Sequence, residues 1–174
     1  MEYHNPVLLK ETVDGLNIKP GGVYVDVTFG GGGHSAEILR RLGPDGKLFA
    51  FDQDEDALAN ALPDERFTLI NENFRFIKRF LRFYGVKGVD GILADLGVSS
   101  HQFDVAERGF STRFDAELDM RMSQKNDLSA YRVVNEYDDA NLRRVFWDYG
   151  ELKNAPALSR TIIEAREKHP IKTT

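Results

Sequence analysis

VYVDVTFGGGGHSAEIL, residues 23–39, joins an apolar run to an amphipathic segment through four consecutive glycines. The apolar run is rich in β-branched and aromatic residues on both faces, which is typical of a strand buried in a parallel sheet. From His34 to Leu42 the apolar residues recur at helical spacing, and the pattern ends before Gly43–Pro44. A strand, a glycine turn and a helix in this order predict the first unit of an α/β fold.

Three further strand–helix alternations with short turns follow this first unit. They predict a doubly wound parallel sheet, because right-handed crossovers place the first strand in the middle and ligands at the carboxyl ends of the strands. The predicted strands are 47–52, 66–74 and 89–95, and the predicted helices between them are 54–62 and 73–86. A shorter helical pattern, residues 6–17, precedes the first strand.

The composition restricts the class of protein. With 41% hydrophobic and 29% charged residues, a chain of 174 residues can form one full core with room for a subdomain. The absence of cysteine excludes disulfides, thiolate metal sites and cysteine nucleophiles. We expect a cytoplasmic protein, since the sequence has neither a signal-peptide pattern nor a run long enough to span a membrane.

Residues beyond 100 change in character. Residues 101–122 have no clear period and predict a long ordered loop, and a helical pattern begins at about 127. A sheet of only four strands would leave the fourth as an unpaired edge. We therefore expect an N-terminal fragment whose remaining strands lie beyond Thr174, and pairing of two copies through the exposed strand is possible.

The charge pattern argues against a chain that coats nucleic acid by bulk electrostatics, because the formal net charge is −5. Basic residues do cluster in residues 74–87. Between an RNA-binding surface and the solvated side of an amphipathic helix, the pattern favours the solvated helix.

The glycine loop does not fit the common phosphate-binding patterns. A Walker loop needs Lys and then Ser or Thr after its last glycine, whereas this chain has His34 and Ser35. A dinucleotide fingerprint would put Ser35 where its third glycine belongs. Asp26, four residues before Gly30, instead predicts a carboxylate at the strand end that accepts hydrogen bonds from loop amides or from a ligand's ammonium group. Asp-x-x-x-Gly-x-Gly resembles the first motif of S-adenosylmethionine-dependent methyltransferases.

A second acid is expected at the end of the second strand, where its two oxygens could bind both hydroxyls of a ribose. Asp52 lies 20 residues after Gly32, and Asp54 is the alternative, which could instead cap the following helix. Phe74 follows the third strand, where its ring would either cover an adenine or belong to the core. Asp95 ends the fourth strand, so three strand ends carry an acid that faces one crevice.

The motifs together resemble one family. VDVTFGGGGHS, FDQD, DLGVSSHQFDVAERGFS and LDMRM are similar to the bacterial ribosomal RNA small subunit methyltransferase H family, whose members are S-adenosylmethionine-dependent 16S rRNA N4-cytosine methyltransferases. The resemblance implies an α/β class I methyltransferase core, a Rossmann-like parallel sheet, with an inserted helical domain after the fourth strand. On this basis residues 1–103 form the S-adenosylmethionine-binding half, and 104–174 begin the inserted RNA-recognition domain.

The resemblance also implies an activity, namely methyl transfer to the exocyclic N4 of a cytidine in the decoding region of small-subunit rRNA. Its substrate would be the RNA or the assembled small ribosomal subunit. The implied cofactor contacts are Gly32, Gly33, His34, Asp52, Phe74, Asp95 and Gln102, to which Asp26 is added from the loop chemistry above. Asp95 is the candidate catalytic residue, because N4 must lose a proton as it becomes cationic.

Several other residues have a structural and a functional interpretation. Arg108, Arg113 and Arg121 could hold RNA phosphate. Alternatively, Arg108 or Arg121 orders the long loop through an ion pair with Asp104, Glu117 or Asp119. Trp147 and Phe146 are expected in the core of the helical part rather than in an RNA-stacking surface. No metal site is expected, since His4 and His101 have no partners at ligand spacing.

Two other functions compete with a methyltransferase. A nicotinamide-dependent oxidoreductase would use the same fold, but Asp26 and the absent third glycine speak against it. A non-catalytic cofactor-binding or ribosome-assembly module is compatible with a sheet of four strands. Binding of S-adenosylhomocysteine rather than NAD would favour the methyltransferase over the oxidoreductase. Transfer of a labelled methyl group would favour it over the non-catalytic module.

Overall fold

The computed structural model describes residues 6–174, which divide into two compact units, the first ending at Gly97 and the second beginning at Val98. His4, whose lack of metal partners was inferred from the sequence, lies outside the described residues. None of the helices formed by residues 6–174 is long and apolar enough to cross a bilayer.

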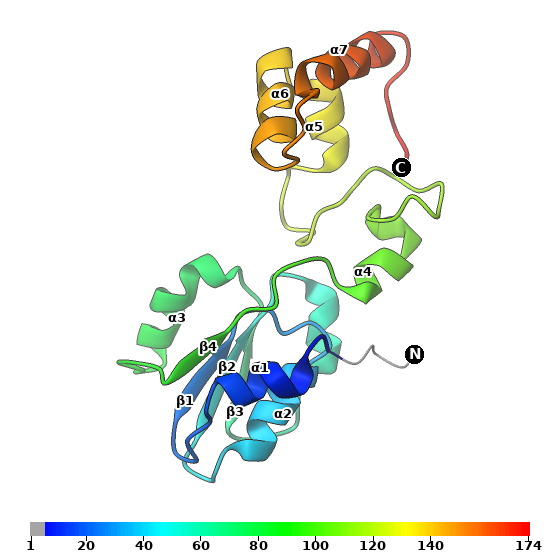
Figure 1. Cartoon of the computed structure of the whole chain (residues 1–174). Helices are drawn as coiled ribbons and strands as arrows, with labels where there is room; N and C mark the ends of the chain where they lie inside the picture. Colours follow the sequence, from blue (N-terminus) through cyan, green and yellow to red (C-terminus); the bar gives the residue numbers. More distant parts are fainter. Residues whose placement is uncertain (1–5) are drawn as a thin grey trace. The chain divides into compact units, whose positions relative to one another are not determined.

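The first unit is an α/β layer structure around a parallel sheet (Figure 1). Its strands have the order β3-β2-β1-β4, so the first strand lies inside the sheet as predicted, and β4 lies at an edge. The register aligns Asp26 of β1 with Ala50 of β2 and with Leu93 of β4. The strands are β1 (Val23–Asp26), β2 (Lys47–Phe51), β3 (Phe67–Ile70) and β4 (Gly91–Leu93).

Helices cover both faces of this sheet. On one face, Tyr24 and Leu48 pack with residues of α1 (Leu9–Gly15) and α2 (Gly33–Arg41). On the other, Val25 and Phe51 pack against α3 (Ile77–Phe83). Alternate residues of one strand thus enter different cores, which explains why the strands are apolar on both faces.

The connection after β2 differs from the predicted α-helix. Residues Glu55–Asn60 form a short 3₁₀ segment, η1, which begins where Asp54 accepts a hydrogen bond from the amide of Asp56 at 3.1 Å. The tighter 3₁₀ winding suits a segment of only six residues that stops just before Pro63. Asp54 is therefore a cap residue, as the second of its two interpretations proposed.

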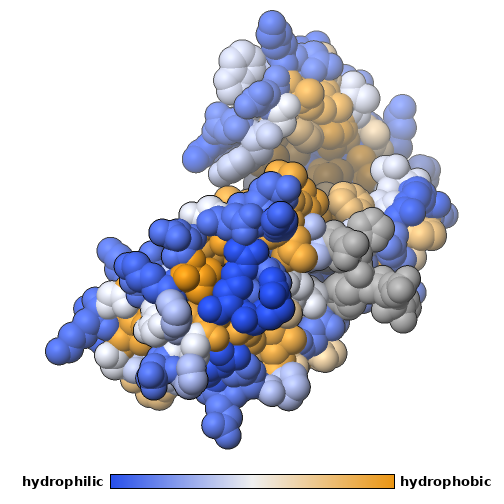
Figure 2. Space-filling view, turned by 60° about the horizontal axis from the view of Figure 1, so that its bottom comes forward, coloured by the Kyte–Doolittle hydropathy of each residue, from blue (hydrophilic) through white to orange (hydrophobic). Residues whose placement is uncertain are grey.

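The basic segment after β3 contains η2 (Phe74–Phe76) and then α3. Phe80 and Leu81 pack on the sheet, whereas Lys78, Arg79 and Arg82 are exposed. This arrangement confirms the solvated face of an amphipathic helix. Figure 2 shows one face of the molecule, on which both hydrophilic and apolar residues are exposed.

The second unit begins with α4 (Ser100–Asp104) and η3 (Ala106–Arg108) and continues through irregular backbone. Three helices then follow, α5 (Ala130–Glu136), α6 (Asp139–Asp148) and α7 (Ala155–Arg166). The extended loop and the later helices agree with the predicted change of character. The assignment of residues 104–174 to an inserted RNA-recognition domain stays a prediction.

Candidate functional site

Three aspartates lie at the carboxyl ends of neighbouring strands. Asp26 is the last residue of β1, Asp52 directly follows β2, and Asp95 lies two residues beyond β4. Because these strands are parallel and adjacent, their carboxyl ends meet at one edge of the sheet. The predicted placement of the three acids at the same edge is thus confirmed.

Asp26 is completely buried, and its carboxylate binds groups of the following loop and helix. Oδ1 accepts a hydrogen bond from the amide of Thr28 at 3.0 Å, and Oδ2 accepts one from the hydroxyl of Ser35 at 2.8 Å. Burial raises the pKa of Asp26, while the bonds from Ser35 and Thr28 oppose that rise. Asp26 accordingly holds the loop amides, one of its two expected roles; contact with a ligand's ammonium group stays a prediction.

Asp52 connects the end of β2 to the glycine loop. Its Oδ2 accepts a hydrogen bond from the amide of Gly30 at 2.8 Å, and its Oδ1 accepts one from the amide of Asp54 at 2.9 Å. Burial also raises the pKa of Asp52, although the residue is partly exposed. Each carboxylate oxygen has two lone pairs, so these bonds leave acceptor capacity for the hydroxyls of a ligand.

Asp95 is exposed, and its main chain is attached to the loop after β1. The amide of Asp95 donates a hydrogen bond of 2.7 Å to the hydroxyl of Thr28. Thr28 was not among the residues predicted from the sequence. A usable signal was present, because an aspartate side chain commonly accepts a hydrogen bond from the amide two residues later, which here is that of Thr28.

The glycines of the loop meet two different requirements. Gly30 and Gly32 have φ angles of +52° and +78°, which residues other than glycine seldom adopt. A Cβ on Gly32 would also lie 2.9 Å from the ring of Phe29. A Cβ on Gly33 would lie 2.2 Å from Cγ of Pro6, so at this position the close neighbour is the protein's own N-terminal segment.

His34 takes part in the same contact with the N-terminal segment. Its ring is buried, and Nε2 lies 3.2 Å from the carbonyl oxygen of Val7. Pro6 and Val7 therefore cover the start of α2 from outside. Sequence reasoning missed this cover, because Pro6 is 27 residues away from Gly33 and no local pattern links them. Cofactor contacts of Gly32, Gly33 and His34 stay predictions.

Phe74 is the first residue of η2, four residues after the end of β3. The side chain of Phe74 is 40% exposed, so the ring is not an ordinary core residue. The preceding residue, Asn73, donates a hydrogen bond from Nδ2 to Oε1 of Gln53 at 2.8 Å and thereby joins the two loops. An exposed Phe74 is compatible with the predicted adenine cover, which stays a prediction.

Gln102 belongs to the second unit and caps its first helix. The side chain of Gln102 accepts a hydrogen bond from the amide of Ser99, while Ser99 Oγ accepts one from the amide of Gln102, each at 3.1 Å. This reciprocal pair is a capping box. A contact between Gln102 and a cofactor stays a prediction.

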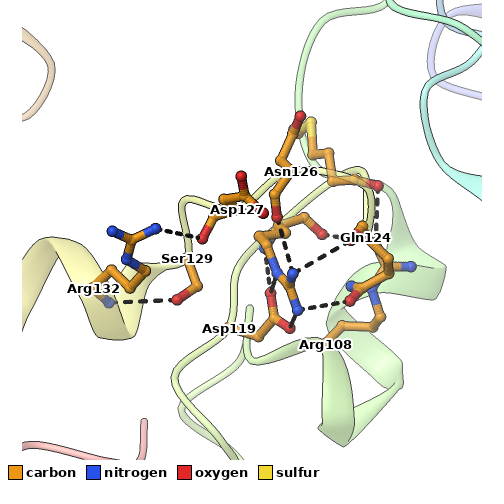
Figure 3. A network of polar contacts seen from close by, with 9 residues as sticks. Arg108, Asp119, Gln124, Asn126, Asp127, Ser129 and Arg132 are labelled. Atoms are coloured by element: carbon orange, nitrogen blue, oxygen red, sulfur yellow. Dashed lines mark hydrogen bonds and ion pairs between the residues drawn. The ribbon is translucent and has the colours of Figure 1, made fainter.

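The long loop is ordered by its arginines (Figure 3). Arg121 forms two hydrogen bonds of 2.8 Å with the carboxylate of Asp119 and lowers the pKa of that acid. Arg108 donates to the carbonyl oxygen of Arg121 at 3.0 Å, and Arg113 binds Asp104 at 2.7 Å. The ion pair of Arg121 with Asp119 confirms the ordering role; RNA phosphate binding stays a prediction.

The expectation that Trp147 belongs to a core is wrong, since its side chain is 60% exposed. Leu142 of α6 is fully buried, and a residue five positions later lies about 140° around a helix from it. Phe146, only four positions from Leu142, turns back toward the buried side and is partly buried. The apolar pattern identified the helix correctly but not the face on which the tryptophan lies.

Comparison with known proteins agrees with this geometry. The sequence matches the MraW methylase family over residues 1–174. The chain belongs to this family. The fold is accordingly the α/β, Rossmann-like fold of a methyltransferase, as the parallel strand order indicates.

Three similar relatives of the chain carry the name ribosomal RNA small subunit methyltransferase H. The protein from Flavobacterium johnsoniae is 87% identical over 174 residues, which are 100% of this chain and 58% of the relative. The protein from Christiangramia forsetii is 71% identical with the same coverage. That from Bacteroides thetaiotaomicron is 56% identical over 99% of this chain and 57% of its own length. The chain thus spans somewhat over half the length of these curated relatives.

A solved structure of a protein assigned as an rRNA methylase from Clostridium thermocellum shares 30% identity with this chain. It covers 41% of this chain and 45% of its own, with a TM-score of 0.39. The fold assignment rests on the strand order and the family rather than on this partial superposition.

The raised pKa of Asp26 predicts a particular pH dependence of stability. Burial places its pKa in the folded protein above the usual value of 3.8, so its contribution to stability is fully present below that pH and is lost as the pH rises through the folded pKa. The free energy of unfolding of the wild type, minus that of Asp26→Asn, should therefore increase as the pH falls from about 7 to about 4. Urea unfolding at a series of pH values measures this difference.

The control for this measurement is Asp45→Asn, which removes an exposed carboxylate just before β2. It shows how the stability responds to pH when an exposed carboxylate is lost. A difference between wild type and Asp26→Asn that shrinks toward acid pH would contradict the prediction.

The contact between Pro6 and Gly33 predicts the effect of a single methyl group. Gly33→Ala should push Pro6 away and open the contact between His34 and Val7, because the added Cβ and the proline ring cannot occupy the same space. Hydrogen exchange at the start of α1 should become faster. Gly21→Ala is the matched control, since a Cβ there meets nothing within 4 Å. Equal exchange in both variants would contradict this account.

Proposed function

We propose that the chain belongs to an S-adenosylmethionine-dependent methyltransferase that acts on the exocyclic N4 of a cytidine in the decoding region of small-subunit rRNA. The observation that carries the proposal is the set of three aspartates at adjacent strand ends, in a chain that belongs to a methylase family. The name shared by the relatives supports small-subunit rRNA as the substrate.

The residues at the strand ends fit such a cofactor. Asp52 is partly exposed and has lone pairs left for ribose hydroxyls, and the ring of Phe74 is open to a planar base. The N-terminus of α2 has no side-chain cap, which suits the carboxylate of a methionine tail. S-adenosylmethionine would supply the electrophilic methyl group when bound.

The chemistry required of the chain is positioning and proton acceptance. The lone pair of N4 in cytosine is delocalised into the ring, so the acceptor nitrogen must first be held in line with the methyl group. Asp95, exposed at the end of β4, accepts a hydrogen bond from the amino group and thereby polarises it. The carboxylate then takes a proton as N4 becomes cationic, or passes it to water.

The proposal is tested by transfer of a labelled methyl group to naked small-subunit rRNA and to undermethylated small subunits. The chain and a version with the length of its relatives should be compared, with large-subunit rRNA as the control substrate. Nucleoside analysis of the labelled RNA should give N4-methylcytidine. A label on another atom would contradict the N4 assignment, and binding without transfer would favour the non-catalytic alternative. Stabilisation by NAD instead of S-adenosylhomocysteine would indicate an oxidoreductase.

The role of Asp52 predicts a loss of cofactor affinity. Asp52→Asn should weaken S-adenosylhomocysteine binding about ten-fold or more, because hydrogen bonds to a charged acceptor are replaced by weaker ones. Calorimetric titration measures the affinity, and Asp45→Asn serves as the control, since it lies at the opposite end of the same strand. Unchanged affinity in Asp52→Asn would remove this residue from the site.

The role of Asp95 predicts a loss of methyl transfer. Asp95→Asn should lower the rate at saturating cofactor about 100-fold, the usual effect of removing a positioned acid or base. Single-turnover transfer of the label measures the rate. A variant that keeps both the cofactor affinity and the full rate of the wild type would refute a catalytic role for Asp95.

A further inference from the structure

Thr28 links the buried end of β1 to the main chain of Asp95. Its hydroxyl accepts the hydrogen bond from the amide of Asp95 at 2.7 Å and lies 3.4 Å from Oδ1 of Asp26, to which it donates. The amide of Thr28 also donates to Oδ1 of Asp26 at 3.0 Å. A single side chain thereby joins segments that are 67 residues apart in the sequence.

This link takes the place of a main-chain hydrogen bond between the two segments. The last main-chain bond between the two segments runs from the amide of Val27 to the carbonyl oxygen of Leu93 at 2.9 Å. Beyond it the first segment continues into the glycine loop. The hydroxyl of Thr28 supplies the acceptor for the next amide, that of Asp95, where a continued strand would have supplied a carbonyl.

The link is anchored on a buried group. The carboxylate of Asp26 is inaccessible to solvent and is shared between Thr28 on one oxygen and Ser35 of α2 on the other. Because packed interiors resist small displacements, the end of β1 holds both the segment of Asp95 and the start of α2 in position. The backbone of Asp95 and the first turn of α2 are consequently positioned relative to the same two oxygen atoms.

We propose that Thr28 is a positioning residue that acts through Asp95. Its hydroxyl fixes the main chain of Asp95 relative to the cofactor loop and so sets the direction from which the Asp95 carboxylate meets the acceptor nucleotide. The inference rests on the proposed function, since the acceptor is the RNA base. The contacts of Thr28 that carry the inference are those with Asp26 and with the amide of Asp95.

The test is a double-mutant cycle with a conservative rescue. Thr28→Val keeps the branched shape but has no acceptor for the amide of Asp95, whereas Thr28→Ser keeps the hydroxyl. In the protein at the length of its relatives, Thr28→Val should lower methyl transfer about ten-fold, the effect of one lost hydrogen bond, and Thr28→Ser should retain most of the rate. Thr68→Val on β3 is the matched control and should leave the rate unchanged.

Coupling to Asp95 separates positioning from a general structural effect. If Thr28 acts through Asp95, adding Thr28→Val to Asp95→Asn should cost little more than Asp95→Asn alone. Amide exchange at Asp95 should accelerate in Thr28→Val but not in Thr28→Ser. Additive losses, or slow exchange at Asp95 in Thr28→Val, would overturn the inference.

The outcomes also separate this inference from the proposed function. A wild-type protein that transfers no methyl group to small-subunit RNA refutes the function and the inference together. An active wild type with an equally active Thr28→Val refutes the role of Thr28 alone. If the wild type is active, Thr28→Val is slow and Thr28→Ser retains most of the rate of methyl transfer, both the proposed function and the role of Thr28 are supported.

Discussion

The burial of the Asp26 carboxylate is the constraint on which the rest of this edge depends. A carboxylate removed from water is costly unless donors surround it, and here the donors come from Thr28 and Ser35. The loop between these residues must therefore return the chain to the end of its own strand. That return requires the left-handed conformations of Gly30 and Gly32, so the glycine run and the buried acid are two parts of one requirement.

Much of the fold could be predicted because it depends on local patterns. Apolar runs between turn residues identified the four strands, and the crossover rule placed β1 inside the sheet without reference to any contact. The acids at the strand ends were predictable for the same reason, since a parallel sheet brings all carboxyl ends to one edge. The capping role of Asp54 followed from its position before a helical pattern.

The remaining features depend on contacts between distant residues or on rotation about a helix. Nothing near Gly33 in the sequence indicates that Pro6 lies against it. The side chain of Gln102 forms a capping box, a local use that competes with any binding role assigned from a motif. Trp147 was misplaced because the helical pattern of α6 tolerates several choices of buried face, and only the packing of Leu142 selects one.

The three aspartates differ in exposure, and under the proposed function these differences suit them to different tasks. Asp26 is fully buried and serves the internal structure of the loop. Asp52 is partly exposed, and each of its oxygens accepts a hydrogen bond from a loop amide. Asp95 is exposed. A group can take up a proton from a substrate only where the substrate can reach it, and a group can hold a backbone rigidly only where water does not compete. Under the proposed function, Asp26 supports the loop, Asp52 binds the cofactor and Asp95 serves the chemistry, and Thr28 connects Asp26 to the main chain of Asp95.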